Sequence, residues 1–148
     1  MEIKFAAEKT LGKLAKWLRI LGFDTIYPSD RTLPVENGRT LLTRTKRIRD
    51  ECKTTQLIFI ESDQPFNQLQ EVVKALGITN EDLKTFTRCI RCNTKIRTID
   101  KNSLRSVVPD YVWESQDSFK TCPKCQRIYW QGSHIKRSRE LIKKLFKS

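Results

Sequence analysis

The residues best suited to chemistry are two pairs of cysteines with the same spacing. Cys89 and Cys92 form the first pair, Cys122 and Cys125 form the second, and residues 93–121 lie between them. Two intervening residues allow a tight turn to present both sulfur atoms to one metal ion, and four thiolates make the closed tetrahedral shell of structural zinc sites. The spacing therefore predicts a zinc ribbon whose ion stabilises the fold and does no catalysis, because no coordination position stays open.

Two disulfide bonds or a redox-active pair are the alternative interpretations of these cysteines. The N-terminal residues Met1–Lys4 do not resemble a signal peptide, and no apolar run approaches the length that crosses a membrane. We therefore expect a cytoplasmic protein with reduced thiols, and this setting favours zinc over disulfides.

The charge of the chain is uneven along its length. The formal net charge is +12, and residues 86–148 hold 15 Lys and Arg against 5 Asp and Glu, whereas residues 1–85 hold 14 against 12. A strongly basic C-terminal part predicts a polyanionic partner, with RNA expected and DNA as a second possibility. The alternative is a solvated basic surface without a specific partner, and protein partners stay open.

The first half of the chain has the pattern of alternating strands and helices, which predicts an α/β fold with a parallel sheet covered on both faces. We expect strands near residues 3–7, 24–27, 40–42 and 57–60, and helices over 11–21, 44–53 and 66–76. The apolar run at 57–60 predicts a strand with both faces buried. Ser62 or Asp63 is expected to cap the next helix, with Pro65 in its first turn.

We therefore predict two domains, an α/β domain over residues 1–84 and a zinc ribbon with a basic C-terminal helix over residues 85–148. Hairpins are expected around the cysteine turns, pairing 85–87 with 95–97 and 118–120 with 127–130. Ser133 is expected to cap the final helix.

Acidic residues follow three of the predicted strands. Ligands of open parallel sheets bind beyond the carboxyl ends of the strands, where Glu8, Asp30 and Asp63 would gather. Carboxylates at such an edge could hold Mg²⁺ or Mn²⁺ and activate water against a phosphodiester. The third strand is followed by Thr45 and no acid, and the alternative is that the three acids are turn and cap residues. Asp24 lies at the amino end of its strand and is expected to be structural.

Basic and aromatic residues near these positions fit a nucleic-acid partner. A cation stripe is more often a solvated face, and ribbon aromatics often pack inside a protein, so packing is the alternative to base stacking. The single histidine is either a polar residue at the helix start or an RNA contact. The candidate nucleic-acid-binding residues are Lys13, Arg44, Arg88, Arg91, Arg127, Trp130 and His134.

Several segments together resemble the Mut-seven C-terminal RNase family of PIN-like ribonuclease domains. The resemblance spans almost the whole chain and is strongest at Ala7–Thr25, Leu41–Arg44, Phe86–Cys92, Cys122–Cys125 and Ile128–His134. It implies a PIN-like three-layer fold with an appended zinc ribbon, and metal-dependent RNA cleavage by an acidic cluster.

The chain departs from the family pattern at the acidic positions. The family usually has Asp where this chain has Glu8, and Asp where this chain has Thr45. Glu8 keeps the charge on a longer side chain, Thr45 loses the charge, and Lys46 adds a cation beside it. The sequence thus predicts a ribonuclease that uses Glu8, Asp30 and Asp63, with Thr45 as the degraded position. The alternative is a catalytically impaired nucleic-acid-binding module.

Overall fold

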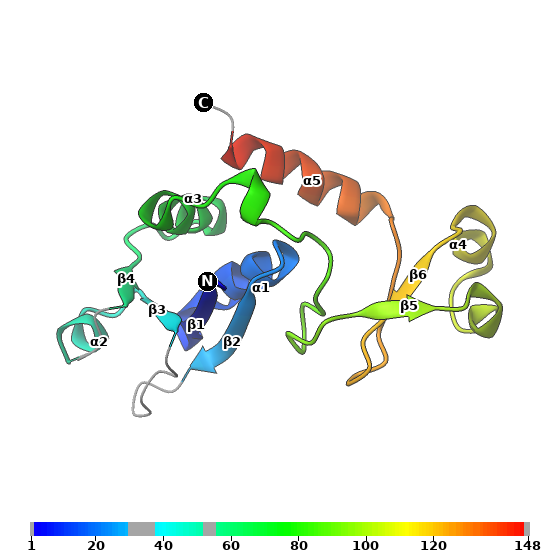
Figure 1. Ribbon diagram of the computed structural model, residues 1–148, viewed down its shortest axis with the longest axis horizontal. Coiled ribbons are helices and arrows are strands. Elements are labelled where there is room, and N and C mark those ends of the chain that lie inside the picture. Colours follow the sequence, from blue (N-terminus) through cyan, green and yellow to red (C-terminus); the bar gives the residue numbers. More distant parts are fainter. Residues whose placement is uncertain (1, 30–37, 52–55, 147–148) are drawn as a thin grey trace. The chain divides into compact units, whose positions relative to one another are not determined.

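A computed structural model describes residues 2–29, 38–51 and 56–146 of the chain (Figure 1). The chain divides into two compact units, Met1–Phe86 and Thr87–Ser148. In the described ranges, no helix combines the length and the apolar character needed to cross a membrane.

The first unit is built on a four-stranded sheet. The strands are β1 (Lys4–Glu8), β2 (Asp24–Ser29), β3 (Arg39–Thr43) and β4 (Leu57–Phe59), in the order β2-β1-β3-β4. All three neighbouring pairs are parallel. The predicted α/β architecture with a parallel sheet is therefore confirmed.

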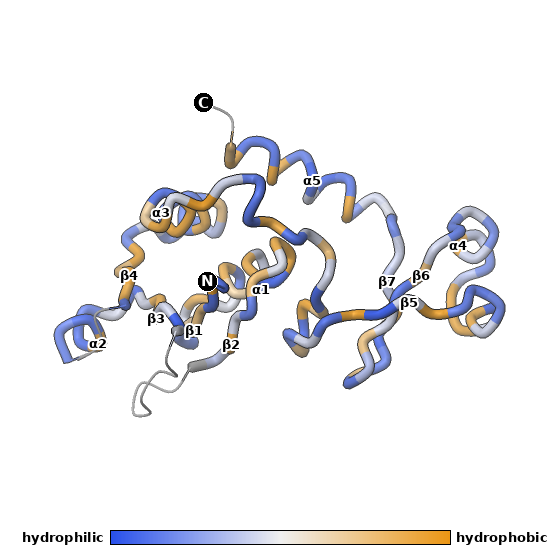
Figure 2. Tube along the Cα trace, in the orientation of Figure 1, coloured by the Kyte–Doolittle hydropathy of each residue, from blue (hydrophilic) through white to orange (hydrophobic). Residues whose placement is uncertain are grey.

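Helices follow the strands in the first unit. They are the 3₁₀ turn η1 (Lys9–Leu11), α1 (Gly12–Ile20), α2 (Lys46–Glu51), α3 (Pro65–Leu76) and the 3₁₀ turn η2 (Asn80–Asp82). Helix α1 contacts β1, β2 and α3. Helix α2 packs Ile48 against Ala6 and Leu41 on one face of the sheet. Successive strand residues point to opposite faces, so Phe5 and Ala7 fill the other side. Figure 2 shows hydrophobic stretches in orange within β1, β3, β4 and α3.

Strand β4 corrects one expectation from the sequence. Leu57–Phe59 are only half-buried, whereas Ile60 just beyond the strand is 1% exposed. The reason is the strand order, because β4 lies at an edge of the sheet and has one neighbour instead of two.

The start of α3 corrects another. Gln64, not Ser62 or Asp63, is the N-cap, and its backbone is extended, as expected for a residue before proline. Pro65 therefore fixes the first helical position, which confirms its predicted place. The Ser62 hydroxyl instead accepts a hydrogen bond from the Gln64 N–H at 3.2 Å.

An ion pair joins three strands at the amino end of the sheet. Arg39 on β3 donates to both carboxylate oxygens of Asp24 on β2, at 3.0 and 3.2 Å, and to the Phe5 carbonyl of β1 at 3.0 Å. Arg39 is 7% exposed, and a bidentate pair satisfies its buried charge. Asp24 is therefore structural, as predicted.

The second unit holds a small antiparallel sheet and three helices. Its elements are β5 (Arg97–Ile99), η3 (Lys101–Leu104), α4 (Asp110–Ser115), β6 (Phe119–Thr121), β7 (Ile128–Tyr129) and α5 (Ser133–Leu145), with the strand order β5-β6-β7. The predicted hairpin around the second cysteine turn exists as β6 and β7, whereas the one around the first turn is reduced to a single bridge between Arg88 and Lys95. Gly132 rather than Ser133 is the N-cap of α5.

The segment between the cysteine pairs forms a core that the sequence did not predict. Leu104, Val108, Val112 and Phe119 are buried together, and Trp130 packs against them. Helix α4 spans only Asp110–Ser115 and buries Val112 alone, so it leaves no helical periodicity in the sequence.

Two glycines with left-handed backbones give a matched test of this fold. Gly22 has φ +99°, and a Cβ there would lie 2.3 Å from the Lys84 carbonyl oxygen, whereas Gly77 has φ +63° and open space around it. We expect Gly22→Ala to lower the free energy of unfolding by more than about 3 kcal/mol, since a backbone clash adds to the strain of positive φ. Gly77→Ala should cost about 1 kcal/mol. Urea unfolding measures both changes. Equal decreases in the free energy of unfolding of the two variants would contradict the close approach of Lys84 to Gly22.

Candidate functional site

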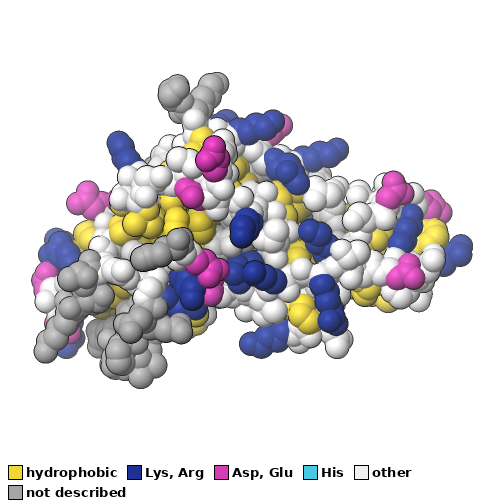
Figure 3. Space-filling view, viewed as in Figure 1, with side chains coloured by type: hydrophobic (Ala, Val, Ile, Leu, Met, Phe, Trp, Pro, Cys, Tyr) yellow, Lys and Arg dark blue, Asp and Glu magenta, His cyan; other side chains and the backbone are white. Residues whose placement is uncertain are grey.

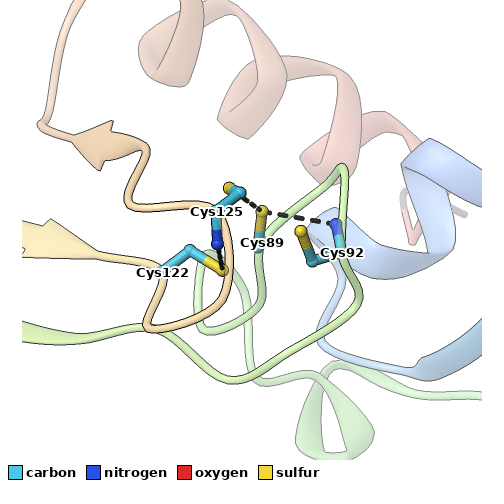
Figure 4. Close-up of side chains that lie close together, drawn as sticks. All are labelled: Cys89, Cys92, Cys122 and Cys125. Carbon is cyan, nitrogen blue, oxygen red and sulfur yellow. Dashed lines mark hydrogen bonds between the residues drawn. The ribbon is translucent and has the colours of Figure 1, made fainter.

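The four paired cysteines converge on one point. Cys89 and Cys92 come from one loop and Cys122 and Cys125 from another, and their side chains face each other (Figure 4). Their sulfur atoms all lie within 4.8 Å of one another, and those of Cys89 and Cys125 are 3.7 Å apart. A tetrahedron with zinc–sulfur bonds of about 2.3 Å has edges of about 3.8 Å. The four thiols are free rather than disulfide-bonded, so the donor set and its spacing fit a structural zinc ion.

The first cysteine turn is held by backbone hydrogen bonds. Cys89 N–H donates to the Thr94 carbonyl at 2.8 Å, and Asn93 N–H donates to the Cys89 carbonyl at 2.8 Å. Asn93 takes φ +65°, which the turn requires and Asn tolerates. Arg88 is 9% exposed and donates to the Asn93 carbonyl at 2.8 Å, so this predicted nucleic-acid contact stabilises the turn.

The second turn repeats the first. Cys122 N–H donates to the Arg127 carbonyl at 3.0 Å, Gln126 N–H donates to the Cys122 carbonyl at 2.8 Å, and Gln126 also takes φ +65°. In each turn the second cysteine's N–H donates to the sulfur of the first, at 3.4 Å in both. The sequence spacing therefore produces two equivalent halves of one metal centre.

The protonation of the sulfurs shows why this cluster needs a cation. Burial raises the pKa of the Cys89 thiol, but the Tyr129 hydroxyl and nearby backbone N–H groups outweigh burial and lower it to about 6. Burial and the adjacent thiols raise the pKa of Cys92 to about 12. The Cys89 thiol thus ionises readily, whereas the neighbouring Cys92 thiol stays protonated, because two thiolates packed together repel each other. A divalent ion removes that repulsion.

A second candidate site lies at the carboxyl edge of the parallel sheet. In the sheet order β2-β1-β3-β4, the connection after β1 runs to its neighbour on one side, and the connection after β3 runs to its neighbour on the other side. The carboxyl ends of β1 and β3, which lie next to each other, therefore form a topological switch point. Glu8 ends β1 and Thr43 ends β3. The strand order therefore places an acid where open α/β sheets bind ligands.

Glu8 is buried and surrounded by hydroxyl groups. It is 3% exposed, and its carboxylate accepts from the Thr10 N–H at 3.2 Å, the Thr45 hydroxyl at 3.1 Å and the Thr43 hydroxyl at 3.5 Å, as well as from the Thr10 hydroxyl. Burial raises the pKa of Glu8, but the hydrogen bonds from Thr10, Thr45 and the Arg44 N–H outweigh it and leave the pKa below its usual value. Glu8 is therefore an ionised carboxylate at neutral pH.

The other two predicted acids are placed differently. Asp63 is exposed in the loop between β4 and α3. Ser29, at the end of β2, pairs with Glu8, and the next residue in the sequence, Asp30, lies outside the described residues. Across the described ranges, the four cysteines are the only group of three or more His, Cys, Asp or Glu residues that could share a metal ion.

Several residues at this edge were missed from the sequence. Thr10 and Thr43 supply hydroxyls to Glu8, and Glu71 on α3 accepts from the Glu61 and Ser62 N–H groups at 3.0 Å each, which holds the loop before Asp63. Gln68, three residues before Glu71, donates to the Ser62 carbonyl at 3.0 Å. A polar pair at i and i+3 beside the apolar stripe of α3 is the signal that could have found them.

The predicted nucleic-acid contacts fall into two groups. Lys13, Arg44, Arg91, Arg127 and His134 are exposed, and Arg127 lies over the Tyr129 ring at 5.9 Å. Trp130 is half-buried and packs edge-to-face with Phe119 at 6.3 Å between ring centres. The packing alternative therefore accounts for Trp130.

Zinc removal tests the four-cysteine centre. We expect about one zinc ion per chain, and a strong chelator should unfold the second unit because its folding depends on the metal. Trp113 and Trp130 lie in that unit and Trp17 lies in the first. The tryptophan fluorescence of Trp113 and Trp130 should change on chelation while that of Trp17 persists, as measured in variants that keep one tryptophan each. A Cys122→Ser variant that binds zinc normally would contradict the assignment.

Comparison with known proteins agrees with this architecture. The family model of the Mut7-C RNAse domain matches residues 3–142, which is nearly the whole chain and includes both Glu8 and the four cysteines. Neither a curated protein nor a solved structure matches the chain. The chain therefore belongs to the Mut7-C RNAse domain family.

Proposed function

We propose that this protein is a PIN-like ribonuclease that hydrolyses RNA phosphodiesters at the carboxyl edge of its parallel sheet. The observation that carries the proposal is Glu8, a buried and ionised carboxylate at the switch point of the sheet in a chain of a ribonuclease family. Ionised groups are rarely buried without a task, and perturbed carboxylates cluster at functional sites. Asp30 and Asp63 complete the proposed acidic site.

The three threonines hydrogen-bonded to Glu8 fit a hard cation, because their side chains offer only oxygen atoms. A Mg²⁺ or Mn²⁺ ion held by Glu8, Asp30 and Asp63 would activate water and neutralise charge on the phosphate. Glu8 supplies a fixed negative charge there. The threonine hydroxyls around it can turn from donors into additional oxygen ligands, and Lys13 and Arg44, both exposed, can hold the RNA phosphate.

A catalytically impaired RNA-binding module is the second candidate, and one contact favours it. The Thr45 hydroxyl donates to Glu8 at the position where the family usually has Asp, so the carboxylate accepts hydrogen bonds from three threonines. A carboxylate whose oxygens already accept several hydrogen bonds gains less from binding a metal ion.

Cleavage of a labelled single-stranded RNA separates the two candidates. In zinc-loaded protein, we expect cutting in Mn²⁺ and none in buffer without Mn²⁺ or Mg²⁺. A Glu8→Gln/Asp63→Asn double variant should cut at least about 100-fold more slowly, because charge neutralisation at the phosphate is removed. Glu61→Gln, which changes an exposed acid in the same loop as Asp63, is the matched control and should cut normally.

The outcomes are distinct. Equal cutting by the protein and the double variant would place the activity elsewhere or in a contaminant. No cutting by the protein, but cutting by Thr45→Asp, would show that Thr45 has disabled the site and would favour the binding module.

The RNA-binding surface is proposed from the distribution of charge in the second unit. Of the five acids in residues 86–148, only Glu140 lies outside the segment 100–118. The exposed face of α5 carries Lys136, Arg137, Lys143 and Lys144. Figure 3 shows Lys and Arg side chains along this helix, and acidic side chains in the part of the second unit around α4. RNA therefore lies along α5 and near Arg91 and Arg127, where phosphates meet cations and few acids.

Salt dependence tests the contribution of α5. We expect Lys136→Gln/Lys143→Gln/Lys144→Gln to lower the slope of log binding constant against log salt by about 2, since each lost phosphate contact removes about 0.7 on a single strand. Gln preserves helix propensity. Binding is measured with zinc-loaded protein in buffer without Mg²⁺ or Mn²⁺, so the result is independent of cleavage and the second unit keeps its metal.

Two controls accompany this triple variant. Replacing the same three lysines by arginine should keep the slope. Arg47→Gln/Arg49→Gln/Lys74→Gln removes three exposed cations from the first unit and should leave the slope nearly unchanged. If both triple Gln variants lowered the salt slope equally, the attraction would come from the net charge of the whole protein, which would contradict a binding role for α5.

A further inference from the structure

The two cysteine turns are equivalent in most details, so a difference between them is informative. In each turn the first cysteine, Cys89 or Cys122, is fully buried, and the second, Cys92 or Cys125, is half-buried. Each first cysteine accepts one N–H from its own turn at 3.4 Å. The equivalence breaks at one contact, because Cys89 alone receives a hydrogen bond from a side-chain hydroxyl.

Tyr129 makes that contact. Its hydroxyl donates to the Cys89 sulfur at 3.1 Å, in addition to the backbone N–H groups of Arg91 and Cys92, whereas the contacts to Cys122 are the backbone N–H groups of Lys124 and Cys125, each at 3.4 Å. Tyr129 belongs to β7, the strand after the second turn, yet it reaches the sulfur of the first. It therefore links the two halves of the metal centre.

The direction of this hydrogen bond is fixed by a second one. The Ile90 N–H donates to the Tyr129 oxygen at 3.3 Å. A phenol hydroxyl has one proton, and an N–H directed at its oxygen leaves that proton for the sulfur. Tyr129 is thus oriented as a donor, and a donor to a thiolate withdraws charge from the sulfur.

We propose that Tyr129 is a positioning residue of the metal centre that holds Cys89 on the ion and suppresses its reactivity, so that Cys92 and Cys125 are the sites where electrophiles react first. Two observations support this division of roles. Cys89 is buried and hydrogen-bonded by Tyr129, while Cys92 and Cys125 are both partly exposed. Groups that hydrogen-bond to metal ligands set the orientation of the ligand and the affinity for the metal.

Reaction at the partly exposed cysteines would release the metal. When a thiolate sulfur adds to the carbon–carbon double bond of a maleimide, the new carbanion takes a proton from water and the sulfur becomes a thioether, which binds zinc poorly. Attack at Cys92 or Cys125 thus opens the centre from its exposed side, and the Tyr129 contact delays attack at Cys89.

Tyr129→Phe tests the proposal in zinc-loaded full-length protein without RNA. The variant removes one oxygen and keeps the ring under Arg127. We expect zinc affinity, measured by competition with a coloured chelator, to fall about tenfold. Timed reaction with N-ethylmaleimide and mass spectrometry of digested peptides should show Cys92 and Cys125 reacting before Cys89 in the unmodified protein. In Tyr129→Phe, Cys89 should react several-fold faster.

Cys122 is an internal control, because its two backbone donors are unchanged in the variant and its rate should stay the same. Tyr111→Phe removes the hydroxyl of a side chain that is 74% exposed and should change neither readout. If the maleimide reactions of Cys89 and Cys122 were accelerated equally in Tyr129→Phe, the whole metal centre would have become less stable, and the proposal would be overturned. An unchanged reaction rate of Cys89 would overturn it as well. If Tyr129→Phe does not fold, reaction of Cys89 before Cys92 in the unmodified protein would also overturn it.

Discussion

The second unit depends on the mutual repulsion of four sulfur atoms and its removal by a cation. The sulfurs lie within 4.8 Å of one another, and burial and the adjacent thiols raise the pKa of Cys92 to about 12. The strands on either side are short, since β7 has two residues and β5 and β6 have three each. Elements of this length are not stable alone, so the metal centre and the small core around Phe119 hold them together.

The first unit has a different constraint, a buried negative charge at the end of its central strand. Glu8 stays ionised because hydroxyls and N–H groups from η1 and from the loop after β3 surround it. The oxygen atoms at this edge could bind a cation, but the hydrogen bonds already compensate part of the negative charge of the Glu8 carboxylate. The charge of Glu8 favours catalysis, and its threonine partners favour a binding role, so the chemistry at this edge depends on whether an ion can displace a threonine hydroxyl from the carboxylate.

The two sites divide the proposed function between them. The exposed cations of α5, with Arg91 and Arg127, offer a surface for phosphates, whereas the acids of the second unit are collected in the segment 100–118. Tyr129 lies half-buried in this unit, with its hydroxyl on a metal ligand and Arg127 over its ring. Arg127, which belongs to the proposed RNA surface, therefore contacts a residue that is hydrogen-bonded to a metal ligand. We expect loss of the metal to weaken RNA binding for this reason.

The sequence alone determined the parallel α/β fold, the four-cysteine centre and the family, because these depend on periodicity and spacing that are local along the chain. Pro65 likewise set the start of α3 through its own backbone restriction. Only the tertiary structure placed β4 at the edge of the sheet, grouped the core around Leu104 and Phe119, and showed Arg88 inside a turn. It also brought Thr43 and Thr45 onto Glu8, and Tyr129 onto Cys89. These contacts join residues on separate strands and loops, and side-chain hydrogen bonds across such distances leave no periodic trace in the sequence.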